Sequence, residues 1–162
     1  MSDLGERKVG VADTMFARYD MASLAVETLT ENSDVEIERY TVPGFKDLPV
    51  AAKKLVQEQG CDIVIALGMA GSADVDKTCA HEASQGLIQV ELDTNTHVLE
   101  VFVYEDEAKN PAELEDIFED RVKRHAENAL KLLEGREALT PRAGEGVRQG
   151  GEDAGPIGGG DT

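Results

Sequence analysis

The chain is 162 residues long, which is enough for one domain with a single hydrophobic core. Its 33 acidic and 16 basic residues give a formal net charge of −17, and this excludes a general nucleic-acid binder because such proteins need a positive field. The sequence shows no secretory signal and no apolar run long enough to cross a membrane. We therefore expect a soluble, cytoplasmic protein with neither a membrane nor a nucleic acid among its partners.

The net charge also predicts how the protein responds to salt. A strongly acidic chain repels itself, and salt screens this repulsion because the Debye length shrinks to about 3 Å near 1 M. We therefore expect a protein adapted to high salt, from a halophile. The alternative is an ordinary acidic surface.

Strand and helix signals alternate along the chain after a polar arm at 1–7, which we expect to be flexible. Short apolar or alternating runs predict strands, and stretches with an apolar period of three to four residues predict helices. The expected strands are 8–12, 35–42, 63–67 and 97–103, and the expected helices are 21–31, 46–59, 75–90 and 111–134.

This alternation predicts a single α/β domain over 8–134, built on a four-stranded parallel sheet in the order 2-1-3-4 with helices on both faces. The edges of such a small sheet are open to a partner subunit. The glycine-rich tail, 135–162, is expected to be partly ordered over the site or over a neighbouring subunit. The two cysteines, too few for a disulfide framework, are expected to be buried free thiols. The third helix is expected to bury Val75, Cys79, Ala83, Leu87 and Val90.

A ligand is expected at the carboxyl ends of the strands, where four loops meet. The contents of these loops suit a flat, polar heterocycle. Phe16 offers a ring for stacking, and the small residues of the third loop allow a close approach of the backbone. The backbone of 42–44 offers a rigid edge for hydrogen bonding. The loops span 13–19, 42–47, 68–77 and 104–110.

Several well-known sites are absent from the sequence. The loop at 68–72 lacks both the GxGxxG spacing and the GK[ST] ending, which argues against a dinucleotide or phosphate loop. Neither a zinc-ligand spacing nor a GxSxG nucleophile elbow occurs. The acidic run at 105–107 is either a loose Mg²⁺ site or, as we favour, a solvated acidic face.

Histidine is the side chain best suited to acid–base work near neutral pH. His81 lies on the polar side of the third helix beside Glu82, and the pattern fits a proton-transfer group and a surface histidine equally well. His125 falls on the inner stripe of the last helix, which slightly favours a packed core histidine over a catalytic one. His97 begins a strand and is expected to be structural.

Six segments form a recognisable set: DTMFARYDMA (13–22), VPGFKDLPVA (42–51), ALGMAG (66–71), DKTCAHEASQGL (76–87), EVFVYEDEAK (100–109) and AGEGVRQGGEDAGP (143–156). This set resembles the archaeal riboflavin synthases. Lumazine synthases share parts of it but carry a longer loop with phosphate-binding residues after the third strand. The chain departs from the archaeal pattern at Tyr104, where a histidine is common, so we expect no essential base at that position.

The resemblance implies a reaction and an assembly. Two molecules of 6,7-dimethyl-8-ribityllumazine would dismutate by transfer of a four-carbon unit, giving riboflavin and 5-amino-6-ribitylaminouracil. No organic cofactor is implied, and Mg²⁺ is an optional helper with unknown ligands. The family implies homopentamers with a site between adjacent subunits. The short loop after the third strand agrees with this, because it frees volume for a second ring.

The resemblance and the loop positions together assign the site. His81 and, second, His125 are the expected catalytic proton handlers. The expected substrate contacts are Asp13, Thr14, Phe16, Arg18, Val42, Pro43, Gly44, Lys46, Asp47, Gly68, Met69, Ala70, Gly71, Ser72, Asp76 and Lys77. Two alternatives remain open: a 6,7-dimethyl-8-ribityllumazine synthase, and a non-catalytic flavin- or lumazine-binding module.

Overall fold

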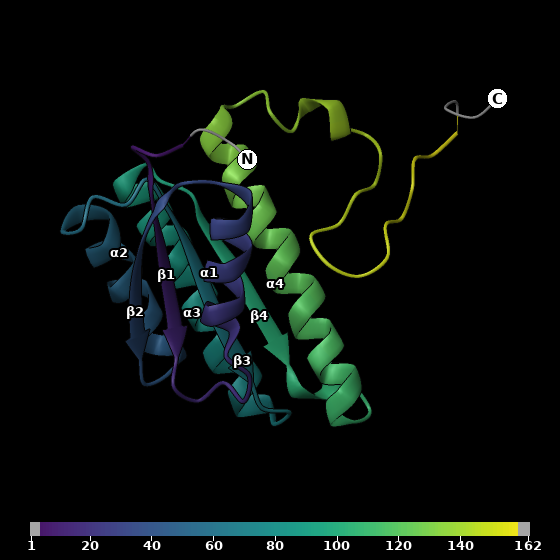
Figure 1. Ribbon diagram of the computed structural model, residues 1–162. Coiled ribbons are helices and arrows are strands. Elements are labelled where there is room, and N and C mark those ends of the chain that lie inside the picture. Colours follow the sequence, from purple (N-terminus) through teal and green to yellow (C-terminus); the bar gives the residue numbers. More distant parts are fainter. Residues whose placement is uncertain (1–3, 159–162) are drawn as a thin grey trace.

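A four-stranded parallel sheet forms the centre of the molecule, with the strand order β2-β1-β3-β4. This confirms the predicted topology. The computed structural model describes residues 4–158, so the ends of the expected arm and tail, 1–3 and 159–162, lie outside the described residues. All four strands point the same way, toward the lower edge of Figure 1. They are β1 (Lys8–Thr14), β2 (Glu36–Val42), β3 (Ile63–Ala70) and β4 (Val98–Tyr104).

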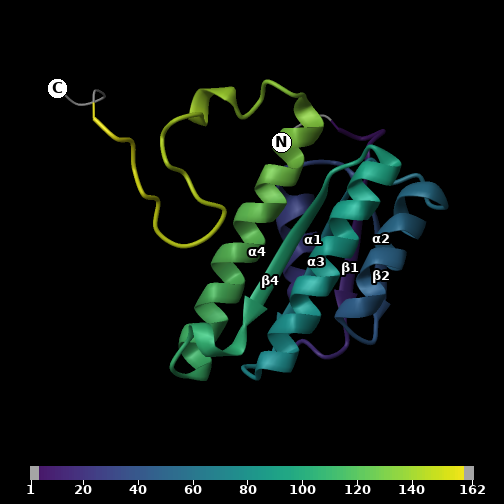
Figure 2. The same cartoon turned by 180° about the vertical axis from the view of Figure 1, so that it is seen from behind.

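Two helices cover each face of the sheet. Figure 1 shows α1 (Met21–Asn32) and α4 (Pro111–Glu134) on one face, and Figure 2 shows α2 (Leu48–Gln57) and α3 (Asp74–Thr94) on the other. Three short 3₁₀ turns complete the described elements, at Phe45–Asp47, Glu105–Glu107 and Thr140–Arg142.

Each face has its own apolar core, because successive strand residues point to opposite faces. Val9 and Val11 of β1 pack under α1 and α4, whereas Ala12 packs under α2 and α3. Phe118 of α4 is almost fully buried and stacks on Tyr19 with ring centroids 5.0 Å apart. The central strands are therefore buried on both sides, as their continuous apolar runs predicted.

Local signals placed the start of α4 correctly. Asn110 caps α4 by accepting a hydrogen bond from the Glu113 backbone at 2.9 Å, and Pro111 follows at the first helical position. The expected cap of α2 is different: Asp47 occupies the cap position, but its side chain makes no capping hydrogen bond. The 3₁₀ turn before α2 already positions the chain there.

Two strands are longer than predicted. β1 continues through Asp13 and Thr14, and β3 continues through Ala70, so that Gly68, Met69 and Ala70 are buried strand residues rather than a loop. The cause is pairing with β4, in which Gly68 lies opposite Phe102 and Ala70 opposite Tyr104. This pairing overrides the loop signal of the small residues.

The buried stripe of α3 begins later than expected. Val75 is 67 % exposed and Cys79 only partly buried, which corrects the prediction for both. The first turn of α3 projects at the rim of the sheet, where the sheet offers no face to cover it. The buried residues of α3 are Ala80, Ala83, Leu87 and Val90.

Segments near both ends of the described chain contact α4. Arg7 donates to the carbonyl of Leu133 at 3.2 Å, near the end of the helix. The tail runs back beside α4 (Figures 1 and 2), where the Gly151 N–H donates to Asp120 at 2.6 Å and Arg124 pairs with Asp153 at 3.2 Å. Within residues 4–158, no helix is long and apolar enough to span a bilayer.

Candidate active site

A cavity of about 240 Å³ opens at the carboxyl ends of β1 and β3, against the first turns of α3. We call it the strand-end pocket. It brings together eight of the predicted substrate contacts and adds two residues that were not predicted, Phe45 and Cys79. Its lining consists of Thr14, Phe16, Pro43, Gly44, Phe45, Met69, Ala70, Gly71, Asp76 and Cys79.

Thr14 is the polar group that marks the strand-end pocket as a ligand site. Its side chain is 6 % exposed, and within the described residues its Oγ1 is the one buried side-chain nitrogen or oxygen without a hydrogen-bond partner. Leaving a buried hydroxyl unpaired costs about 1–3 kcal/mol. A ligand with a donor or acceptor at this position would recover that cost.

The glycines near the pocket make room for side chains rather than directly for a ligand. A Cβ on Gly68 would lie 2.5 Å from Cε1 of Phe45, and a Cβ on Gly71 would lie 2.5 Å from Oδ2 of Asp76. The Phe45 ring in turn packs edge-on against Phe102, with centroids 4.6 Å apart. Gly68 therefore lies under Phe45 and does not line the pocket.

Asp13 points to the opposite face of the sheet from Thr14. Its two carboxylate oxygens accept hydrogen bonds from Thr41 at 2.6 Å and from Arg39 at 2.8 Å, and Arg39 also reaches Asp20 at 3.2 Å. The alternation of side chains along β1 explains this, since neighbouring strand residues face opposite ways. Asp13 belongs to an ion-pair network under α1, not to the strand-end pocket.

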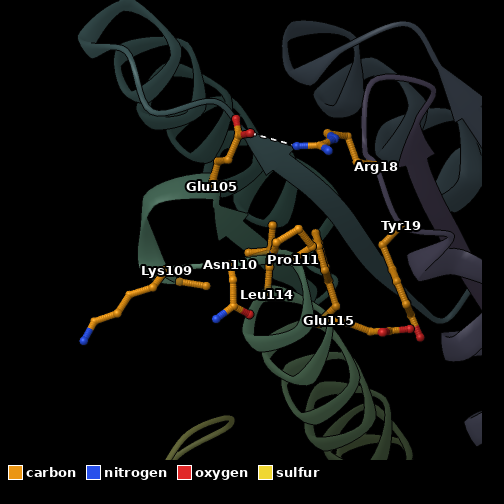
Figure 3. A pocket seen from close by; sticks show the side chains of 10 residues that line it. Arg18, Tyr19, Glu105, Lys109, Asn110, Pro111, Leu114 and Glu115 are labelled. Carbon is orange, nitrogen blue, oxygen red and sulfur yellow. Dashed lines mark hydrogen bonds and ion pairs between the residues drawn. The ribbon is translucent and has the colours of Figure 1, made fainter.

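Arg18 lies in a different cavity, which has a volume of about 440 Å³. Figure 3 shows Arg18 reaching across to Glu105, with 2.9 Å between Nη1 and the carboxylate, while Tyr19 and Glu115 line the opposite side. This cavity joins the loops after β1 and β4 beside α4. Arg18 therefore does not line the strand-end pocket.

The two predicted lysine contacts form ion pairs at the surface. Lys46 pairs with Glu82 at 2.9 Å and Lys77 pairs with Asp106 at 2.6 Å, and these hydrogen bonds raise the pKa of both ammonium groups. Neither lysine lines the strand-end pocket.

Three further predicted contacts also lie outside the lining of the pocket: Val42, Asp47 and Ser72. The carbonyl of Val42 accepts a hydrogen bond from the Met15 backbone at 2.9 Å, which anchors the loop that carries Phe16. Ser72 is exposed at the turn before α3.

Comparison with known proteins decides the family. The 6,7-dimethyl-8-ribityllumazine synthase family model matches residues 6–137. The chain belongs to that family.

Within the family, the chain is of the archaeal riboflavin synthase type. It is 54 % identical to the riboflavin synthase of Methanothermobacter thermautotrophicus over 93 % of this chain and 99 % of the relative. It is 52 % identical to the riboflavin synthase of Aeropyrum pernix over 92 % of this chain and 97 % of the relative. The match to the 6,7-dimethyl-8-ribityllumazine synthase of M. thermautotrophicus is weaker, at 37 % identity over 46 % of this chain. The predicted enzyme class is confirmed.

Neither histidine expected to handle protons in this riboflavin synthase faces the strand-end pocket of its own chain. His81 is exposed, with its Nε2 3.2 Å from Nε2 of Gln85. It follows Cys79, which lines the pocket, by two residues and therefore lies about 200° further round α3.

His125 is a packed core histidine in this chain. It is 9 % exposed, and its Nδ1 lies 2.8 Å from the carbonyl oxygen of Arg121. Burial lowers its pKa, which favours the neutral form of the ring. It sits roughly 21 Å along α4 from the first residue of that helix, at the usual helical rise.

The acidic run after β4 does not fit a Mg²⁺ site in this chain. Glu105 pairs with Arg18, Asp106 with Lys77, and both oxygens of Glu107 accept hydrogen bonds from Arg121 at 2.7 and 2.8 Å. Among the described residues, no group of three or more histidine, cysteine or acidic side chains is arranged to hold a metal ion. We therefore derive no step through a metal.

The sequence contained a signal for each of the two pocket residues that were not predicted, Phe45 and Cys79. Phe45 directly follows the VPG motif that was assigned to the ligand, and its ring alone could have suggested a second aromatic wall. Cys79 lies three residues after Asp76, so the two share one side of α3. Cys79 was assigned to the core because it falls in the four-residue apolar spacing of Val75, Ala83 and Leu87.

Proposed function

We propose that the chain converts two molecules of 6,7-dimethyl-8-ribityllumazine into riboflavin and 5-amino-6-ribitylaminouracil by transfer of a four-carbon unit. The observation that carries this proposal is the identity of about half of all residues to riboflavin synthases over nearly their full length. The strand-end pocket supports it by its position and its lining. The proposal needs no organic cofactor.

The pocket suits one flat heterocycle. The ring of Phe16 is 55 % exposed at the mouth and offers a stacking face. The backbone of Pro43 and Gly44 lies along one side for hydrogen bonds to the pyrimidine edge. The unpaired hydroxyl of Thr14 lies at the base and is free to bind a ring or ribityl oxygen.

A single chain does not hold two substrate molecules in this pocket. Its volume of about 240 Å³ lies below the range of roughly 300–1,000 Å³ that is usual for sites of small ligands. The shortened loop after β3 therefore does not by itself provide room for both rings. We propose that an adjacent chain completes the site in a homopentamer.

The outer side of α3 supports such an assembly. Ile88 and Leu92 are 54 % and 75 % exposed there, close to β4, which forms one edge of the sheet. Exposed apolar side chains beside an edge strand are features that subunit contacts cover. A ring requires two different patches on each chain to meet, so the pocket of one copy can face the outer side of α3 in the next.

Catalysis in this scheme depends mainly on how the two substrate rings are positioned. Holding two identical rings face to face contributes up to about 7–11 kcal/mol. The remaining task is removal of a proton from a ring methyl, whose electron pair is delocalised into the heterocycle. General acid–base help of this kind contributes about 10²–10⁴-fold. We assign it to His81, acting from an adjacent chain, because His125 is packed in the core of its own chain.

The test is turnover of ribityllumazine alone by the purified protein in molar KCl. Riboflavin and the uracil product should appear in equal amounts. A protein that makes ribityllumazine from 5-amino-6-ribitylaminouracil and the four-carbon phosphate would instead be a lumazine synthase. Bound ligand without any turnover would indicate a binding module. Either result would contradict the proposal.

We also propose that the chain is adapted to high salt. Its net charge of −17 gives strong self-repulsion at low ionic strength, and screening relieves it. The melting temperature should rise steadily from 0.1 M to about 2 M KCl as the Debye length shrinks. Sucrose, which favours burial without screening charge, serves as the control and should give a smaller rise. A melting temperature that does not change with KCl concentration would contradict the proposal.

A further inference from the structure

Glu100 is a half-buried acid without a cationic partner. It lies in the edge strand β4, on the face that α3 covers, and its carboxylate accepts a hydrogen bond from the hydroxyl of Ser84. Within residues 4–158 it takes part in none of the ion pairs. Burying part of a carboxylate without a cationic partner costs free energy of folding. A carboxylate kept in such a position is therefore a candidate for a functional role.

The charged groups around Glu100 do not neutralise it. From α3, Glu91 repels it, whereas the hydrogen bond from Ser84 and, more weakly, His81 favour its ionised form. From its own strand, Tyr104 is neutral. From α4, Arg121 already donates hydrogen bonds to Glu107 and to the carbonyl of Phe102. Burial, the largest influence, therefore raises the pKa of Glu100 above its usual value.

His81, Ser84 and Glu100 form one row, which we call the α3–β4 row. Ser84 follows His81 by three residues, so the two lie on the same side of α3, and Ser84 binds Glu100 directly. One turn before His81, Lys77 is already paired with Asp106. Glu100 is therefore an acidic group near His81 that forms no ion pair with another residue.

The α3–β4 row and the strand-end pocket lie on opposite sides of α3. Cys79 lines the pocket, whereas His81 is turned about 200° away from it. Ile88 and Leu92 continue the outer side of α3 beyond the row, and both are exposed. A second copy that covers this apolar surface would contact the same side of α3 as the row.

We propose that the α3–β4 row of one chain works on substrate bound in the strand-end pocket of the next chain. This inference rests on the proposed function. His81 takes the proton from the ring methyl onto an imidazole nitrogen, and the electron pair of the C–H bond moves into the heterocycle. Glu100 is a positioning residue: its carboxylate, held by the hydroxyl of Ser84, stabilises the imidazolium that forms on His81. The proton returns to the uracil product when the carbon unit leaves.

Glu100→Gln should lower kcat by about 10–100-fold, as loss of an orienting partner does for metal-bound histidines. KM should stay within about twofold, because the variant leaves substrate binding untouched.

Stability separates this role from a structural one. The pKa of Glu100 is raised in the folded state, so the carboxylate opposes folding once the pH rises above that pKa. Glu100→Gln should therefore keep or raise the melting temperature at neutral pH. Asp93→Asn removes one acid from the far end of α3 and is the matched control, with wild-type kcat expected. Wild-type kcat in Glu100→Gln would overturn the proposal.

Mixed assemblies test whether the row acts across chains. One chain carries Gly44→Trp, which fills the pocket and leaves the row intact. The other carries His81→Ala with Glu100→Gln, which leaves the pocket intact. Each is inactive alone, but in an equimolar mixture about a quarter of the head-to-tail contacts join an intact pocket to an intact row.

The mixture should recover about a quarter of the wild-type rate if assembly is random. No recovery, with both chains shown to assemble together, would mean that pocket and row must belong to one chain, and the proposal would fall. A wild-type protein that forms no riboflavin would instead reject the proposed function, so the two failures are distinguishable.

Discussion

Gly44→Trp is expected to abolish riboflavin formation while the fold stays intact. Gly44 lines the strand-end pocket with φ near −161°, an extended conformation that any residue adopts, and a Cβ there would meet no atom within 4 Å. The indole can therefore enter the pocket without straining the backbone. Displacing the ring from its reacting geometry should cost about 10²-fold or more in turnover.

Substrate binding and folding are measured separately for this variant. Titration of ribityllumazine fluorescence should show that affinity is lost, and the melting temperature should match that of the wild type. Val50→Trp adds the same side chain to α2 at a position that is 52 % exposed, and it should leave binding and turnover unchanged. Wild-type affinity in Gly44→Trp would show that the substrate binds elsewhere.

Gly68→Ala should destabilise the protein and disturb the pocket together. The new methyl group would lie 2.5 Å from Cε1 of Phe45, and Phe102 packs against the other side of that ring. Overpacking of this kind typically costs about 1–3 kcal/mol. The free energy of unfolding by urea should fall by this amount, and ribityllumazine should bind more weakly because Phe45 lines the pocket.

A double-mutant cycle identifies Phe45 as the cause. Phe45→Ala alone should be destabilising, since it removes a large packed ring. In that background Gly68→Ala should cost much less, because the methyl group then has space. Additive free energies would show that Gly68 is needed for another reason, such as the backbone conformation of β3.

The layout of the fold could be predicted from the sequence because each of its signals is local. Continuous apolar runs predicted β1 and β3 to be buried central strands, and the alternating pattern of β2 predicted an edge strand. Asn110 and Pro111 marked the start of α4. Right-handed crossovers between parallel strands then leave few possible orders, and the observed one was among them.

The ends of the strands were harder to predict than their centres, and the candidate site depends on where the strands end. Small residues such as Gly68 and Ala70 signal a loop when read alone, yet pairing with β4 keeps them in the sheet. Because side chains alternate, extending β1 by two residues decides that Thr14 faces the strand-end pocket and Asp13 the other side. No local signal records how far a neighbouring strand continues.

The sequence by itself determined which family of fold this chain adopts and which loops meet at the ligand edge, since apolar period and turn chemistry are properties of short segments. The tertiary structure alone decided which side chains share a cavity. It placed Phe45 over Gly68, left the hydroxyl of Thr14 unpaired, and joined Ser84 of α3 to Glu100 of β4. These relations depend on contacts between segments far apart in the chain, whose distances and directions are set only when the sheet and its helices pack together.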